Sequence, residues 1–161
     1  MADPCTDKAL QLLTRRPHFR RELETKLLGR GFEPEAVTRT LDRLTELRYL
    51  DEEAAVRGFV EGRLRRGPVG RRRLEADLGR RGADGETAAR VLDDLVAGDD
   101  REAALEAAHA FARGRRRDPA AVARHLERKG FSRRAIFAVL DELRGSFEEL
   151  PDEASDEPFD P

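Results

Sequence analysis

Three glycines divide this chain into similar segments, because the same apolar residues surround each of them at the same distances. Gly31, Gly82 and Gly130 lie 51 and 48 residues apart. A leucine or valine stands four and eight residues before each glycine, and a leucine stands ten and thirteen residues after it. Such a period is typical of repeat proteins, whose units cannot bury their apolar faces alone. The chain is therefore expected to form a stack that offers a surface for binding.

Each segment has the pattern of three short helices, and no strand pattern of useful length is present. In the first segment we expect helices over residues 8–15, 19–30 and 34–48, the last with Val37, Leu41 and Leu44 on one face. Asp51, Asp84, Asp118 and Ser132 have the side chains preferred at helix N-caps. The predicted fold is an all-α, elongated, curved array of three tandem three-helix repeats. Its predicted boundaries are 1–50, 51–98, 99–145 and an acidic tail, 146–161.

Composition agrees with thin helical cores, because 40% of the residues are charged and only 6% are aromatic. No stretch approaches the roughly 18–20 apolar residues of a membrane span. The N-terminal residues lack the apolar core of a signal peptide, so we expect a cytoplasmic protein with no membrane partner. Cys5 is the single cysteine, and we expect it to lie near a loose end of the chain and to have no role.

The net charge of −2 hides an uneven distribution of charge. Residues 146–161 hold seven acids and no base, so removing them changes the net charge from −2 to +5. Bases concentrate around the second helix of each repeat, and acids dominate the third helices of the last two repeats. A stack of such repeats is expected to place the bases on one side. Genome composition is an alternative explanation for the 28 arginines among 31 bases.

The second repeat carries the strongest predicted anion site. Arg71, Arg72 and Arg73 occupy the expected first turn of a helix, where the partial positive charge of the helix disfavours cations. We expect them to bind a phosphate backbone or an acidic protein surface. The candidate partner-binding residues are Arg63, Arg65, Arg66, Arg71, Arg72, Arg73, Arg80, Arg81, Arg115, Arg116 and Arg117.

No catalytic or metal-binding motif is visible, so we expect neither an enzyme nor a bound cofactor or metal. His18, His109 and His125 are scattered and have no partner at metal-ligand spacing. Tyr49 is expected to pack between the first two repeats, and Phe137 is expected to lie in the core rather than in a stacking platform.

The segment from Leu44 to Gly82 resembles the signature of the bacterial RecX regulatory proteins. The matching positions are Tyr49-Leu50-Asp51, the turn Gly67–Gly70, the bases Arg71–Arg73, and Leu78 to Gly82. The first repeat is similar to the same pattern in Arg21-Glu22-Leu23, Lys26-Leu27 and Gly31-Phe32. Pro17-His18 departs from it, since the family often has a serine cap there. The resemblance extends over about residues 8–145.

This resemblance implies a modulator of the RecA recombinase that docks along the groove of the RecA–single-stranded-DNA filament. Such a protein would inhibit ATPase, strand-exchange and coprotease activities, and some family members bind DNA themselves. We expect a monomer whose partners are the RecA filament and single- or double-stranded DNA contacted through its backbone. The alternative is a helical DNA-binding regulator that acts independently of RecA.

Overall fold

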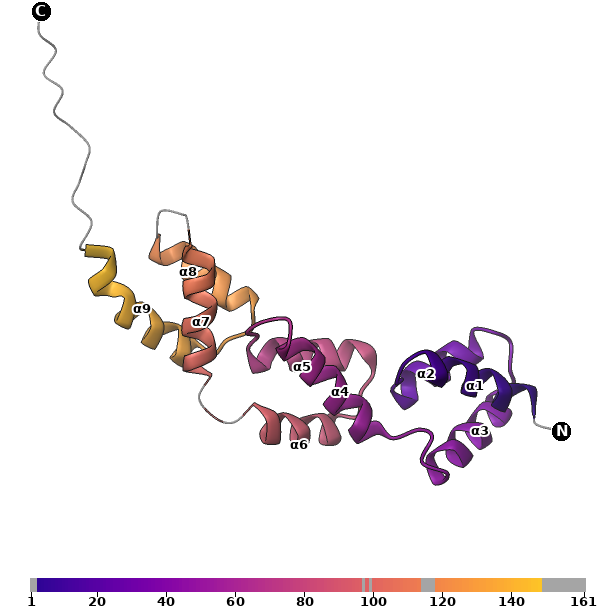
Figure 1. Cartoon of the computed structure of the whole chain (residues 1–161). Coiled ribbons are helices and arrows are strands. Elements are labelled where there is room, and N and C mark those ends of the chain that lie inside the picture. The colour runs from indigo at the N-terminus through magenta and orange to yellow at the C-terminus, as the bar shows by residue number, and fades with distance from the viewer. Residues whose placement is uncertain (1–2, 97, 99, 114–117, 149–161) are drawn as a thin grey trace, which may run out of the picture.

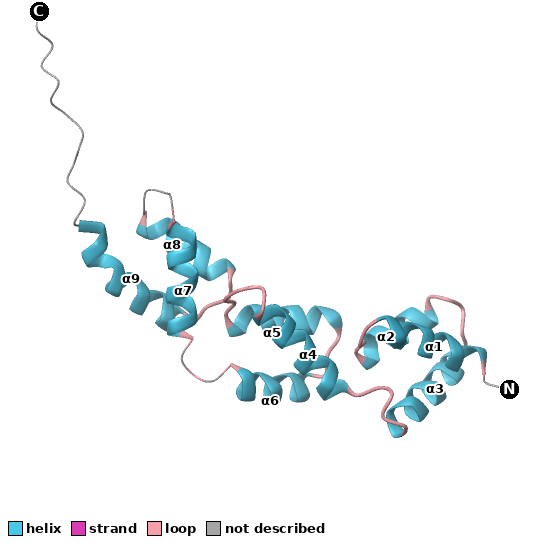
Figure 2. Ribbon diagram, viewed as in Figure 1, coloured by secondary structure: helices cyan, strands magenta, loops and turns pink. Residues whose placement is uncertain are grey.

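The computed structural model describes residues 3–96, 98, 100–113 and 118–148, with side chains up to Arg144. This part of the chain holds nine helices and no strand (Figure 2). The helices are α1 (Pro4–Arg15), α2 (Arg20–Leu28), α3 (Pro34–Glu46), α4 (Glu52–Leu64), α5 (Arg71–Arg81), α6 (Gly85–Leu95), α7 (Arg101–Ala112), α8 (Pro119–Arg128) and α9 (Arg133–Glu148). None of the described helices is long and apolar enough to cross a lipid bilayer.

The nine helices form three successive groups along an elongated, curved molecule (Figure 1). α1–α3, α4–α6 and α7–α9 each pack mainly among themselves. Each group has a separate core, built around Leu23 and Leu41, around Leu74 and Leu92, or around Leu126. The predicted all-α array of three-helix repeats is therefore confirmed. The exact repeat boundaries remain a prediction.

One aromatic side chain crosses a repeat boundary. Phe19 precedes α2 in the first repeat, yet it packs in the core of the second with Val56 and Leu78. Its ring meets that of Phe59 edge-on, with centroids 6.3 Å apart. Phe19 is 1% exposed, so the burial of a whole aromatic ring holds the first repeat against the second.

The helix ends follow the expected local chemistry. The three repeat glycines have positive φ values, 84° at Gly31, 77° at Gly82 and 83° at Gly130, which an L side chain rarely adopts. Asp51 accepts the Ala54 N–H, and Asp84 accepts the Thr87 N–H. The predicted caps at Asp118 and Ser132 are also present. Each cap satisfies a backbone donor that the helix leaves free.

Three predictions about packing are wrong. Cys5 is not at a loose end but 1% exposed within α1, which starts four residues earlier than expected. Tyr49 is 62% exposed instead of packing between repeats, and Phe137 is 69% exposed instead of lying in a core. For Phe137 the neighbouring Ile136 and Val139 already occupy the buried side of α9.

Candidate functional site

The boundary between the second and third repeats, the second junction, is a contact between two turns. Residues 68–73 meet residues 129–131 backbone to backbone. The Gly70 N–H donates to the Lys129 carbonyl at 2.9 Å, and the Arg72 N–H donates to the Gly130 carbonyl at 3.2 Å. Lys129 Nζ also donates to the Pro68 carbonyl at 2.8 Å. These bonds fix the start of α5 against the end of α8.

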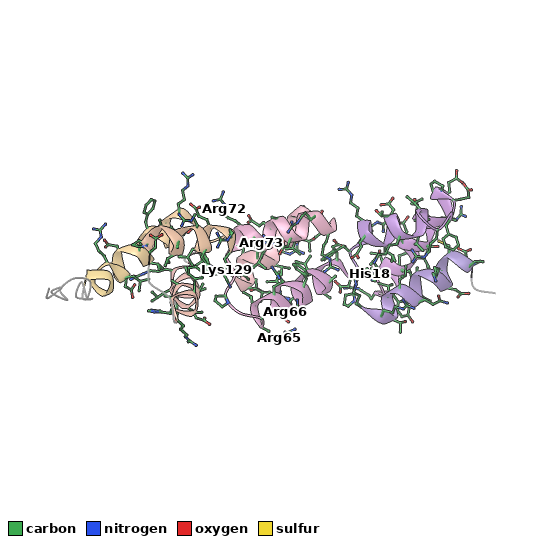
Figure 3. The ribbon with its side chains drawn as sticks, turned by 90° about the horizontal axis from the view of Figure 1, so that it is seen from above. His18, Arg65, Arg66, Arg72, Arg73 and Lys129 are labelled. Atoms are coloured by element: carbon green, nitrogen blue, oxygen red, sulfur yellow. The ribbon has the colours of Figure 1, made fainter. Side chains whose placement is uncertain are left out.

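Several cations surround the second junction. Figure 3 shows Arg72, Arg73, Lys129, Arg66 and Arg65 across this boundary, well away from His18 of the first repeat. Arg65, Arg66, Arg72 and Arg73 are exposed, and Lys129 is half-buried. Arg65 lies 3.9 Å from Glu61, whereas Arg66 and Arg72 make no ion pair with any other described residue.

The three arginines in the first turn of α5, Arg71–Arg73, have different surroundings. Arg71 donates to Glu75 at 2.8 Å and to Asp93 of α6 at 2.6 Å, and these bonds raise the pKa of Arg71. Arg73 pairs with Asp77 at 3.2 Å. Of these three arginines, Arg72 alone makes no ion pair with a described residue, so the three do not form one uniform anion site.

Asp77 gathers three of the candidate arginines. Arg63 lies 2.9 Å from its carboxylate, and Arg73 and Arg80 also pair with it. Burial acts to raise the pKa of Asp77, but the Arg80 hydrogen bond and the Arg73 and Arg63 charges outweigh it, so the pKa is lowered. Arg63 therefore joins α4 to α5 through a carboxylate that is 9% exposed, and Arg80 pairs with the same carboxylate from within α5.

Arg81 belongs to the boundary between the first and second repeats, the first junction. Its guanidinium lies 5.0 Å from the ring centroids of both Phe19 and Phe59 and 3.2 Å from Glu22 of α2. Cation–π contacts of this kind stabilise by about 0.5–2 kcal/mol. Arg81 therefore acts within the fold. Arg115, Arg116 and Arg117 lie outside the described residues, so their predicted role remains a prediction.

Two grooves flank the second junction. The first, about 540 Å³, is lined by Arg72, Arg73, Ala76, Glu127, Arg128, Gly130, Phe131, Arg133 and Ile136. The second, about 600 Å³, is lined by Arg66, Gly67, Pro68, Ala107, Ala110, Phe111, Arg113, His125 and Lys129. Among the described residues, no acid lines the second groove and one acid lines the first. The pattern of residues did not identify Arg113, Arg128, Lys129 and Arg133 as site residues. They join the second repeat only through the turn-to-turn contact, Arg113 and Lys129 beside the turn before α5 and Arg128 and Arg133 beside α5.

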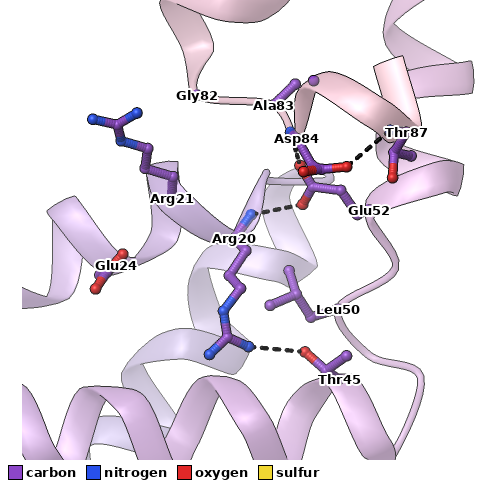
Figure 4. A pocket seen from close by; sticks show the side chains of 11 residues that line it. Arg20, Arg21, Glu24, Thr45, Leu50, Glu52, Gly82, Ala83, Asp84 and Thr87 are labelled. Carbon is purple, nitrogen blue, oxygen red and sulfur yellow. Dashed lines mark hydrogen bonds between the residues drawn. The ribbon is translucent and has the colours of Figure 1, made fainter. Parts of the chain in front are cut away.

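A cavity of about 670 Å³ at the first junction has a different character. Its Glu52 accepts the Arg20 N–H at 2.9 Å and the Asp84 N–H at 3.0 Å, and Arg20 reaches Thr45 (Figure 4). These bonds connect α2 and α3 to the start of α6. Acids and bases share the walls, so this cavity is a structural joint with little attraction for an anion.

His18 is a packing residue at the first junction. Burial lowers the pKa of His18, and a 2.8 Å contact between Nδ1 and the Arg16 carbonyl opposes that effect only partly. The ring is therefore neutral, donating from Nδ1 and accepting from Lys26 Nζ at Nε2, 2.9 Å away. Among the described residues no group of three or more histidines, cysteines and acids could hold a metal ion.

Known proteins with similar sequences and structures belong to one family. Residues 5–44 match the family model described as RecX, first three-helix domain. The chain is 37% identical over 144 residues to the regulatory protein RecX of Halorhodospira halophila, an alignment covering 84% of this chain and 88% of that protein. The chain belongs to the RecX family. The RecX proteins of Chlorobium limicola and Mycobacterium sp. (strain JLS) are 39% and 38% identical over 74 and 95 residues.

Those two alignments cover 46% and 52% of the RecX relatives concerned, so the chain matches about half of their length. Solved RecX structures share the fold. The crystal structure of RecX from Lactobacillus salivarius has a TM-score of 0.71 at 20% identity, covering 87% of this chain and 94% of that chain. A second crystal structure of regulatory protein RecX has a TM-score of 0.74, covering 85% and 71%.

Proposed function

We propose that this protein is a negative modulator of the RecA recombinase. It binds along the groove of the RecA–single-stranded-DNA filament and inhibits ATP hydrolysis, strand exchange and coprotease activity, acting as a cytoplasmic monomer without a cofactor or catalytic role of its own. Support comes from RecX family membership and from the cations at the second junction that no described acid neutralises, above all Arg66 and Arg72.

The elongated shape supports the same proposal. Three repeats in a row present their boundaries along one molecule, so contacts can extend over neighbouring subunits of a filament. Exposed arginines at the middle of this array suit bidentate contacts with carboxylates or phosphates on such a partner. Their attraction depends on ionic strength, because exposed charges are screened by salt.

The test is RecA-driven ATP hydrolysis and strand exchange on single-stranded DNA, with and without this protein. We expect inhibition by the wild type and its loss in the double variant Arg66→Glu, Arg72→Glu. Arg39→Glu in α3 is the matched control, since Arg39 is exposed and unpaired among the described residues. Substituting Arg71 or Arg73 would instead break ion pairs within the fold.

Two outcomes would contradict the proposal. Wild-type protein that leaves both RecA activities unchanged, while binding DNA in a salt-sensitive way, would support the alternative of a DNA-binding regulator independent of RecA. Equal inhibition by the wild type and the double variant would show that the RecA contact does not depend on the second junction.

A further inference from the structure

Phe137 is the most exposed of the large hydrophobic side chains among the described residues. Its 69% exposure exceeds that of Tyr49, Leu47 and Leu28. Residues three and four apart in a helix share a side, which places Arg133 and Arg134 next to Phe137 on α9. The fold itself gains little from this apolar ring beside two arginines, because most of the ring lies in water.

Phe137 also follows directly after Ile136, which together with Arg133 lines the 540 Å³ groove of the second junction. The opposite wall carries Arg72 and Arg73, and α8 contributes Arg128. Cations thus come from both repeats and from three helices, and the aromatic ring lies on the helix that forms one edge of the groove.

Most of this charge is not neutralised within the protein. Arg72, Arg128 and Arg133 make no ion pair with any described residue, whereas Arg73 is paired with Asp77. Glu127 is the one acid among the described residues that line the groove. Placing unpaired cations around a single groove raises their mutual repulsion, which an anionic ligand would relieve.

We propose that this groove binds single-stranded nucleic acid. Arg72, Arg128 and Arg133 contact successive phosphates, and a base stacks on the exposed face of Phe137. Positively charged grooves edged by aromatic rings are the usual means of binding single strands, since every base has a face that can stack. This site rests in part on the proposed function, because it shares Arg72 with the proposed RecA contact and gives a location to the expected single-stranded DNA partner. Its test contains no RecA, so failure of one proposal can be told from failure of the other.

The exposed ring of Phe137 favours a single strand over a duplex or an acidic protein surface as the partner. In a duplex both faces of each base are already stacked, so Phe137 would find no partner there and only the arginines would contribute. An acidic protein surface would likewise use the arginines and leave the ring in water. A single strand uses both features, and its unstacked bases can reach α9 while the backbone follows the groove.

The first experiment measures fluorescence anisotropy of a labelled dT oligonucleotide of about 15 nucleotides, long enough for one such site. We expect Phe137→Ala to weaken binding about tenfold or more, as expected for the loss of one stacked base. Tyr49→Ala is the matched control, because Tyr49 is 62% exposed but lies in the first repeat. Equal effects of the two variants, or equal loss of affinity for a duplex of the same length, would overturn the stacking role.

The second experiment uses the absence of tryptophan from the chain. In Phe137→Trp the indole is the sole tryptophan fluorophore, and stacking predicts that dT oligonucleotides quench it at the concentration where anisotropy rises. Replacing Arg72, Arg128 and Arg133 together by Gln should reduce the slope of log affinity against log salt by about 2, since each single-strand phosphate contact contributes about 0.7. An unquenched indole, or a slope changed no more than by Arg39→Gln, would contradict the site.

Discussion

Gly70 and Gly130 touch through their backbones. A β-carbon on Gly70 would lie 2.3 Å from the carbonyl carbon and oxygen of Gly130, far inside van der Waals contact. Gly130 in turn is so close to α5 that its own β-carbon would lie 2.3 Å from the Arg73 nitrogen. The second and third repeats therefore meet at one glycine in each turn, where no β-carbon separates the two backbones.

Gly70→Ala should separate the second and third repeats. The methyl group cannot fit against a backbone that is itself held by hydrogen bonds, so we expect a loss of roughly 2 kcal/mol or more in stability. Thermal denaturation checks the loss, and faster amide hydrogen exchange at Arg72 checks its location. Gly79→Ala is the control, because Gly79 lies within α5 with open space around it and alanine favours a helix by about 1 kcal/mol. A Gly70→Ala protein as stable as Gly79→Ala would contradict the contact.

Glu22 should make the first junction sensitive to acid. Burial acts to raise its pKa, but hydrogen bonds from Arg16 and Lys26 outweigh this effect and hold the pKa at about 2, below the ordinary 4.5. Because the folded state binds the proton less readily than the unfolded state, the stabilisation is complete above about pH 4.5. It is lost as the pH falls towards about 2.

The test of this acid sensitivity compares the melting temperature of the wild type and Glu22→Gln between pH 2 and pH 7. We expect Glu22→Gln to lower the free energy of unfolding by on the order of 2 kcal/mol at pH 7, and by much less near pH 2. Glu35→Gln in α3 serves as the control, since Glu35 is exposed and unpaired among the described residues. A difference between wild type and Glu22→Gln that stays constant with pH would rule out the ion pairs as its source.

Asp77→Asn should destabilise the second repeat. The substitution leaves Arg63, Arg73 and Arg80 around a neutral side chain that is largely buried, and breaking such a pair costs several kcal/mol when both partners are buried. Since these arginines are partly exposed, we expect the free energy of unfolding, measured by urea denaturation, to fall by about 2 kcal/mol. Asp93→Asn breaks the more exposed pair with Arg71 and should cost less than about 1 kcal/mol. Equal losses would show that the burial of Asp77 is irrelevant.

Removing the negative charge of residues 149–161 should strengthen binding to an anionic partner. This segment contributes six acids and no base, so its deletion changes the net charge from −2 to +4. Long-range attraction should then accelerate association, most clearly at low salt. Stopped-flow measurements with a labelled oligonucleotide would show this. A variant of full length with the six acids replaced by Asn and Gln separates charge from length, and an association rate unchanged in both variants would exclude any effect of the tail.

The helices could be predicted from the sequence because their signals are local. Asp51, Asp84 and Ser132 cap helices by hydrogen bonds to the residue three positions on, so each bond depends only on neighbours in the chain. The apolar spacing around Gly82 likewise follows from the helical period, which places Leu74 and Leu78 on one face. These features require no knowledge of how the repeats pack against one another.

The candidate site was predicted less completely, because charge is neutralised by residues distant in sequence. Arg71 and Arg72 are adjacent and chemically identical, yet Arg71 pairs with Asp93 of α6 while Arg72 faces the groove. Lys129 joins the site only because Gly130 meets Gly70. The sequence pattern therefore identified a basic region but could not separate structural arginines from those free to bind a partner.

The sequence by itself determined three helical repeats and the glycines that end their second helices, since helix period, caps and left-handed backbone are properties of a few consecutive residues. Only the tertiary structure decided that Phe19 enters the core of the next repeat, that Phe137 faces water, and that the second junction gathers the unpaired cations. The physical reason is that burial and ion pairing depend on which elements come together in space. The contact at the second junction, for example, joins residues about 60 positions apart in the sequence.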